Sequence, residues 1–128
     1  RSQVLSLHVP LTAKTRGFIG AEQLALLPKD ALLINTARGE VVDEAALIVA
    51  LRERRLYAAG LDTMAVEPLP ADSELLGLHN VVLTPHVGGS TPAALAGMAA
   101  GAARNVLGFL NGTPVAPSAC VNPNVFDT

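Results

Sequence analysis

Three side chains of this sequence form a set suited to proton transfer and anion binding: Arg38, Glu67 and His86. A histidine side chain titrates near neutrality and can give or take a proton, and a neighbouring carboxylate favours its charged form. A guanidinium binds a carboxylate through two parallel hydrogen bonds. These residue types can therefore exchange a proton and bind an anion if the fold brings them to one site.

Each of these residues, and Asp62 at the end of a predicted strand, also has a purely structural interpretation. An arginine before a glycine, as at Arg38, is usually a solvated loop residue. An acidic residue at the end of a strand, such as Asp62, is as often a turn former or a helix cap. Glu67 stands in a proline-containing acidic loop that is typical of a surface, and His86 can be a structural histidine after Pro85. A functional site is favoured because polar residues follow every predicted strand.

The elements that must position these side chains alternate between short strands and longer helices. Apolar runs predict strands at residues 4–8, 31–35, 57–61 and 81–83. Such alternation is typical of α/β proteins with a parallel sheet, whose ligands collect outside the carboxyl ends of the strands. Two further histidines, His8 and His79, are interpreted as loop residues without a role in proton transfer.

Capping residues mark the predicted helices. Asp43 is a typical N-cap, while Thr91 followed by Pro92 marks another helix start, because the fixed φ of proline is already helical. Gly112 suits the left-handed stop of the last helix. The predicted helical segments are residues 21–27, a helix that follows Asp43, a single turn at 73–76, and a long helix over 91–110.

Composition limits the chain to one globular domain's worth of material. It has 128 residues, 50% apolar and 16% charged, so a disordered tail is excluded. The formal net charge of −2 gives no reason to expect nucleic acid or an anionic membrane as a partner.

No uninterrupted apolar run reaches the ~18 residues that span a bilayer. The single cysteine, Cys120, cannot form an internal disulfide, which favours a cytoplasmic location. We expect no metal site.

Five linked motifs resemble the D-isomer-specific 2-hydroxyacid dehydrogenase family. They are the segments 8–12, 33–39 with 42–43, 60–62, 67–68 and 84–91. The likeness covers residues 4–112, and the run Gly88-Gly89-Ser90-Thr91 is closest to phosphoglycerate dehydrogenases. It implies an oxidoreductase that transfers a hydride between NAD, with NADP not excluded, and a small D-2-hydroxy or 2-oxo acid. It also implies a homodimer.

The resemblance assigns roles to individual residues. Arg38 would bind the substrate carboxylate and polarise its carbonyl, His86 would be the general acid/base, and Glu67 would pair with His86. Asp62 would lie near the nicotinamide carboxamide. The cofactor contacts that the resemblance implies are Val9, Pro10, Thr36, Ala37, Arg38, Asp62, His86, Gly88 and Gly89, where the two glycines would let the backbone approach the ligand.

The expected fold is the second half of a Rossmann-like, doubly wound parallel sheet with a carboxyl-terminal helix, as a fragment of a two-domain protein. Residues 1–90 would be a partial dinucleotide-binding domain, because they contain no G-x-G-x-x-G phosphate loop. Residues 91–111 would be a helix that returns to the substrate domain, and 112–128 an irregular tail. Since the first residue is Arg1, we expect the chain to continue upstream. The alternative is a truncated remnant that acts as a binding or dimerising module.

Overall fold

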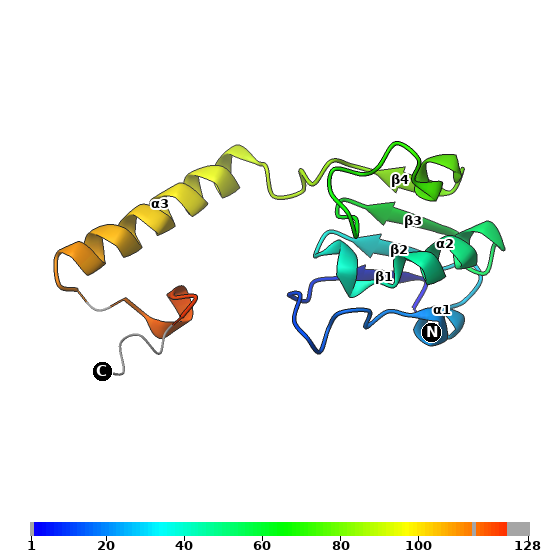
Figure 1. Ribbon diagram of the computed structural model, residues 1–128, viewed down its shortest axis with the longest axis horizontal. Helices are drawn as coiled ribbons and strands as arrows, with labels where there is room; N and C mark the ends of the chain where they lie inside the picture. Colours follow the sequence, from blue (N-terminus) through cyan, green and yellow to red (C-terminus); the bar gives the residue numbers. More distant parts are fainter. Residues whose placement is uncertain (1, 114, 123–128) are drawn as a thin grey trace. The chain divides into compact units, whose positions relative to one another are not determined.

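The computed structural model describes residues 2–113 and 115–122, and the chain divides into two compact units between Gly88 and Gly89. The first unit is a parallel sheet with helices, and the second contains one long helix (Figure 1). All residues expected to do chemistry, apart from Gly89, belong to the first unit.

The sheet of the first unit has four parallel strands in the order β1-β2-β3-β4. They are β1 (Val4–Leu7), β2 (Leu32–Asn35), β3 (Ala58–Leu61) and β4 (Val81–Leu83). The predicted strands are confirmed, and the first three are each one residue shorter at one end. The last residues of the strands, Leu7, Asn35, Leu61 and Leu83, pair in one row. The four carboxyl ends therefore open onto a single edge of the sheet.

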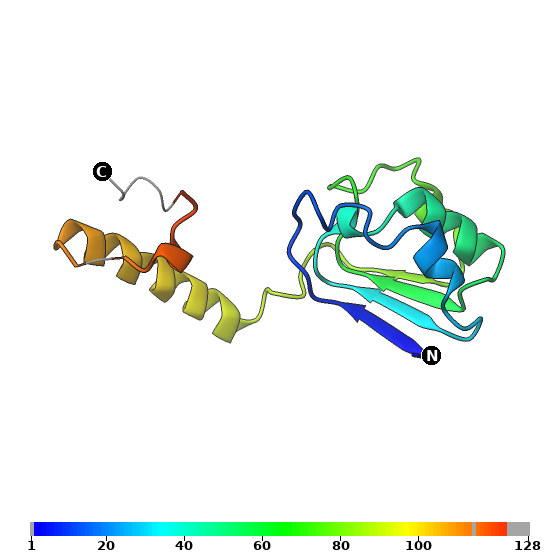
Figure 2. The same cartoon turned by 90° about the horizontal axis from the view of Figure 1, so that it is seen from below.

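Two helices, α1 (Ala21–Ala25) and α2 (Glu44–Arg52), lie on the same face of this sheet (Figure 2). The predicted cap of α2 is confirmed, because Asp43 Oδ1 accepts a hydrogen bond from the Ala46 N–H at 3.1 Å. Helix α1 ends two residues earlier than predicted. Leu26 and Leu27 close tighter turns ahead of Pro28, whose ring disfavours helical backbone in the residue before it.

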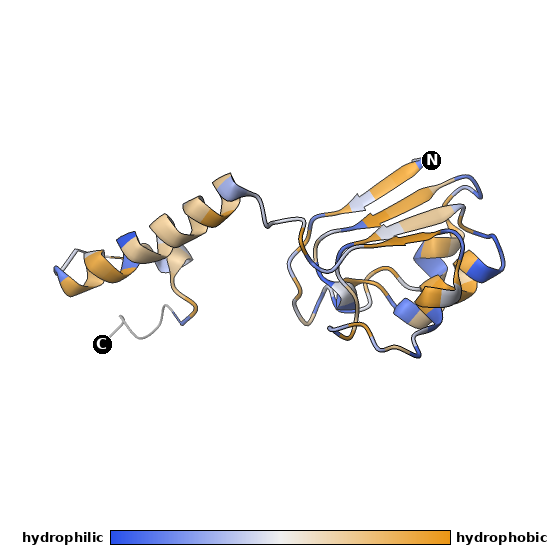
Figure 3. Ribbon diagram, turned by 90° about the horizontal axis from the view of Figure 1, so that it is seen from above, coloured by the Kyte–Doolittle hydropathy of each residue, from blue (hydrophilic) through white to orange (hydrophobic). Residues whose placement is uncertain are grey.

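The core lies between the helices and the sheet. Leu33 of β2 and Leu47 and Leu51 of α2 are almost completely buried there. The opposite face of the sheet has no helix within this unit, and its strands are largely hydrophobic (Figure 3). On this open face Val4 is 56% exposed and Val82 68%. The first unit thus has the layers to cover only one face, as expected of half of a doubly wound sheet.

Two short 3-10 helices, η1 (Gly39–Val41) and η2 (Glu74–Gly77), complete the first unit. The η2 turn confirms the predicted helical turn, and its cap is Ser73, whose Oγ accepts from the Leu75 N–H.

The second unit is built around α3 (Pro92–Leu110), whose predicted start and stop are confirmed. Thr91 Oγ1 accepts from the Ala94 N–H at 3.1 Å, and Gly112 has a φ of +72°. Beyond it, the described residues of the tail contain only the short turn η3 (Pro117–Ala119).

Helix α3 differs from the expectation in one respect. Its 19 residues and mean hydropathy of 1.3 make it long and apolar enough to cross a membrane by length and composition. Uninterrupted apolar runs did not predict this, because the average extends over Arg104 and Asn105. Length and composition are weak evidence for a span, because other kinds of helix also meet them.

Candidate active site

The turn after β2 places Arg38 at the carboxyl edge of the sheet. The amide of Asn35, 1% exposed, ties this turn together: its Nδ2 donates to the Arg38 carbonyl at 2.9 Å and its Oδ1 accepts from the Ala37 N–H at 3.1 Å. Gly39 then passes against the backbone of Met64, where a Cβ would lie 2.0 Å from the Met64 carbonyl. Residue 39 must therefore be glycine for the turn to adopt this path.

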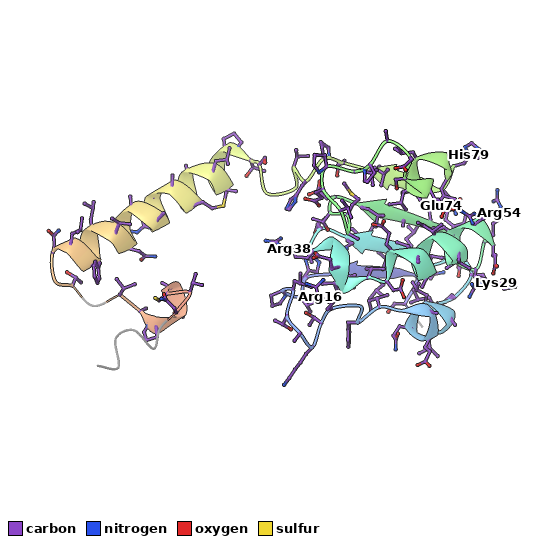
Figure 4. All side chains as sticks on the ribbon, in the orientation of Figure 1. Arg16, Lys29, Arg38, Arg54, Glu74 and His79 are labelled. Carbon is purple, nitrogen blue, oxygen red and sulfur yellow. The ribbon has the colours of Figure 1, made fainter. Side chains whose placement is uncertain are left out.

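A cavity of about 540 Å³ opens beside Arg38, at the ends of β1 and β2. Its lining residues are His8, Val9, Pro10, Leu11, Thr36, Ala37 and Arg38. Five of these are expected cofactor contacts. Arg38 Nη1 donates to the Ala37 carbonyl at 2.6 Å, and within residues 2–113 and 115–122 no carboxylate pairs with its guanidinium. Figure 4 shows Arg38 beyond the arrowheads of the strands. The cavity thus has an unneutralised cation at its wall.

His86 and Glu67 form the expected pair. His86 Nδ1 donates to Glu67 Oε2 at 2.8 Å, and Glu67 Oε1 accepts from the Met64 N–H at 2.9 Å. The hydrogen bond from His86 is the main cause that lowers the pKa of the Glu67 carboxyl, and the Met64 N–H adds to it. Because the ionised Glu67 accepts a hydrogen bond from Nδ1 of His86, the ring keeps a proton on Nδ1. The other ring nitrogen, Nε2, is then the one that can contact a substrate.

Asp62 follows β3 and is only 6% exposed. Its carboxylate accepts hydrogen bonds from the Thr84 hydroxyl and from the backbone N–H groups of Val87 and Gly88. The Thr84 hydroxyl is the largest cause that lowers the pKa of Asp62; burial opposes it, and the two N–H groups add to it. Sequence analysis gives no separate role to Thr84, although it ends a predicted strand and opens the motif 84–91.

A second cavity, of about 600 Å³, adjoins His86 and Glu67 at the end of β4. Its lining is mostly apolar: Met64, Glu67, Pro68, Leu69, Leu76, Leu83, Thr84, Pro85 and His86. The structure therefore pairs His86 with Glu67, but it does not bring Arg38 into the same cavity. The reason is that β3 separates β2 from β4, which places their ends about 10 Å apart.

The two glycines expected to approach a cofactor differ. At Gly88 a Cβ would lie 2.8 Å from Asp62 Oδ2, so a side chain here would displace either this backbone or the Asp62 carboxylate. At Gly89, in the second unit, a Cβ would meet nothing within 4 Å. Among the described residues no group of three or more His, Cys, Asp and Glu side chains could hold a metal ion.

Sequence comparison finds known proteins that are similar to this chain. A sequence model described as the D-isomer specific 2-hydroxyacid dehydrogenase NAD-binding domain matches residues 1–88. The glyoxylate/hydroxypyruvate reductase B of Erwinia tasmaniensis is 50% identical over 122 residues, which are 95% of this chain and 37% of that protein. The chain thus spans little more than a third of the length of such relatives. The narrower likeness to phosphoglycerate dehydrogenases stays a prediction.

Solved structures agree. A D-isomer specific 2-hydroxyacid dehydrogenase from Xanthobacter autotrophicus Py2, in complex with NADPH and MES, is 45% identical in sequence and has a TM-score of 0.77. The match covers 89% of this chain and 46% of the chain in that structure. D-lactate dehydrogenase with NAD+ from Lactobacillus jensenii is 39% identical and also has a TM-score of 0.77. That match covers 88% of this chain and 38% of the dehydrogenase chain. The chain therefore belongs to the D-isomer specific 2-hydroxyacid dehydrogenase family, and residues 1–88 are part of its NAD-binding domain.

Proposed function

We propose that the protein containing this chain transfers a hydride between NAD or NADP and a small D-2-hydroxy or 2-oxo acid. The observation that carries the proposal is the 2.8 Å hydrogen bond between His86 Nδ1 and Glu67 Oε2 at the carboxyl edge of the sheet. An acid/base histidine held by a carboxylate at this edge suits proton transfer to a ligand bound there.

The residues supply the proton and the anchor. In the direction of reduction, the His86 Nε2–H gives its proton to the carbonyl oxygen, which becomes the hydroxyl of the product. Glu67 stabilises the imidazolium before this transfer. Arg38, free of any described carboxylate, would extend from the end of β2 toward His86 and bind the carboxylate of the acid through its planar donors. In the direction of oxidation the same nitrogen takes the proton back.

The cavity beside Arg38 fits one end of a dinucleotide. Its volume of about 540 Å³ lies within the roughly 300–1,000 Å³ usual for small-molecule sites, and backbone from the ends of β1 and β2 lines it. Val9, Pro10, Thr36 and Ala37 would hold the nicotinamide side, and Asp62 Oδ2 keeps one acceptor position for the carboxamide. When bound, the nicotinamide supplies the hydride that is added to C2 of the acid.

We propose glyoxylate and hydroxypyruvate as the substrates, on the strength of the 50% identity to a reductase named for them. The test uses the full-length protein and follows the oxidation of NADH and NADPH with glyoxylate, hydroxypyruvate and pyruvate. His86→Ala should lower kcat by about 10²- to 10⁴-fold, while His79→Ala, before the start of β4 and so at the opposite end of that strand from His86, should retain turnover. A kcat of His86→Ala close to that of the wild type would refute the assignment of the acid.

A second candidate, a binding or dimerising module without catalysis, is favoured by the open face of the sheet. Val4 and Val82 on this face are more than half exposed, and an uncovered apolar sheet tends to associate. In the enzyme we expect the rest of the longer chain to cover it. Residues 1–128 expressed alone should then associate or unfold and fail to bind NADH in calorimetry. A monomer with a sharp melting transition would contradict this expectation.

A further inference from the structure

Asp62 is the one ionisable side chain that is buried among the described residues. Its backbone N–H donates to the Asn35 carbonyl at 2.9 Å, so the pairing of β2 with β3 continues through it. A buried carboxylate is unfavourable unless donors surround it. Here the donors come from the segment after β4: the Thr84 hydroxyl and the Val87 N–H reach Oδ1, and the Gly88 N–H reaches Oδ2 at 2.7 Å.

His86 lies in the middle of the segment that these bonds hold. Its φ is +55°, a left-handed conformation that costs a non-glycine residue about 1 kcal/mol. The His86 N–H donates to the Thr84 carbonyl at 3.0 Å, across Pro85. The Asp62 carboxylate therefore bonds the chain on both sides of His86, and these bonds offset the unfavourable backbone.

Gly88 makes this arrangement possible. Its φ is not positive, so its conformation does not require glycine; what requires it is the distance of 2.8 Å from a Cβ to Asp62 Oδ2. Any side chain at 88 would push the backbone away from the carboxylate or displace Asp62. The 2.7 Å bond from the Gly88 N–H would then lengthen.

We propose that Asp62 is a positioning residue: together with Thr84 and Gly88 it holds the turn 84–88 so that His86 Nδ1 faces Glu67. This rests on the proposed function, in which His86 exchanges the proton. It adds a role for Asp62 that differs from contact with a cofactor, because the three bonds exist within the chain itself. Gly88 serves this role by admitting the carboxylate.

Asp62→Asn tests the carboxylate without changing its size. An amide presents one oxygen and one NH₂ group, so whichever way it is turned, the NH₂ faces the N–H of either Val87 or Gly88. At least one bond to the segment after His86 is lost. Gly88→Ala should have the same effect from the other side, and Thr84→Val should remove the hydroxyl bond, which Thr84→Ser restores.

The experiment uses the full-length enzyme with glyoxylate and hydroxypyruvate as substrates. Asp62→Asn and Gly88→Ala should each lower kcat about 10- to 100-fold, as expected when a reacting group is displaced by about 1 Å. Thr84→Val, at a residue that is not an expected cofactor contact, should also lower kcat, while its Kd for NADH, from fluorescence titration, should change less than about threefold, a shift below 1 kcal/mol. The double variant should be no slower than the slower single variant, because both changes break one arrangement. Asp72→Asn, the same chemical change at an exposed position, is the matched control.

A spectroscopic readout separates this proposal from the proposed function. ¹⁵N NMR of the imidazole, recorded without substrate, should show the hydrogen-bonded Nδ1–H of His86 in the wild type and its loss in Asp62→Asn and Gly88→Ala. If the wild type reduces none of the acids, the proposed function fails, yet the NMR comparison still decides the positioning role. An unchanged His86 Nδ1–H signal in Asp62→Asn and Gly88→Ala would overturn it.

Discussion

His86 Nδ1 and Glu67 Oε2 lie 2.8 Å apart, although 19 residues of sequence separate them. Both side chains remain partly exposed, at 45% and 34%. Within the part of the chain that the structure describes, no protein group forms a hydrogen bond with Nε2 of His86. The pair is therefore prepared for a proton transfer in which the second nitrogen of the ring meets the substrate.

Glu67→Gln should leave much of the turnover, whereas His86→Ala should lower kcat by about 10²- to 10⁴-fold. The amide oxygen of glutamine can still accept the hydrogen bond from Nδ1, while alanine removes the group that exchanges the proton. Steady-state rates of the full-length enzyme test this, and a kcat of His86→Ala that matches the wild type, or a loss in Glu67→Gln as large as that in His86→Ala, would contradict it.

Arg38→Lys should raise the KM for the acid substrate about tenfold or more, because an ammonium cannot make the two-point contact of a guanidinium, and bonds to charged groups contribute roughly 1.5–3 kcal/mol. The KM for NADH should change little. Arg55→Lys, on an exposed arginine that pairs with Glu53, serves as the control. An Arg38→Lys enzyme with a wild-type KM for glyoxylate would show that the carboxylate binds elsewhere.

Gly39→Ala should destabilise the fold toward the upper end of the roughly 1–3 kcal/mol typical of overpacking. Its Cβ would lie 2.0 Å from the backbone carbonyl of Met64, and neither backbone can move without displacing the turn that carries Arg38. Gly77→Ala is the matched control, since a Cβ there meets nothing within 4 Å. Urea unfolding of the two variants should therefore give clearly different midpoints.

Thr63→Val should stabilise the protein by about 1 kcal/mol, because an unsatisfied buried polar group costs roughly 1–3 kcal/mol. Thr63 is 2% exposed, and its hydroxyl has no hydrogen-bond partner in the described chain. Valine has nearly the same shape without the hydroxyl. Thermal unfolding measures the change, and a lower Tm in the variant would mean that the hydroxyl has a partner in the full-length protein.

Acid should weaken the carboxylate contacts of the site. The folded-state pKa values of Asp62 and Glu67 are lowered from 3.8 and 4.5, so their contribution to stability is fully present above these values and is lost as the pH falls through the lower folded-state values. Asp62→Asn should therefore have a lower Tm than the wild type at pH 6, and this difference in Tm should narrow as the pH falls below 3.8. A difference in Tm that does not narrow in acid would contradict this linkage.

Much of the fold could be predicted because its signals are local. The strands follow from short apolar runs. Helices α2 and α3 begin directly after Asp43 and Thr91, because the side-chain oxygen of each accepts a hydrogen bond from the free N–H three residues further along. The predicted end of α1 is two residues too late. The helix ends in turns with hydrogen bonds between residues three apart, ahead of Pro28, and the spacing of apolar residues does not predict such turns.

The sequence by itself determined the residue types of the site and the order of the strand ends that carry them. Only the tertiary structure decided that Arg38 lines one cavity and the pair of Glu67 and His86 another. It also decided that Gly88 lies against the carboxylate of Asp62, 26 residues away. The physical reason is that a hydrogen bond or a close approach depends on distances of a few tenths of an ångström between distant loops, and these are fixed by packing of the whole sheet edge rather than by local sequence.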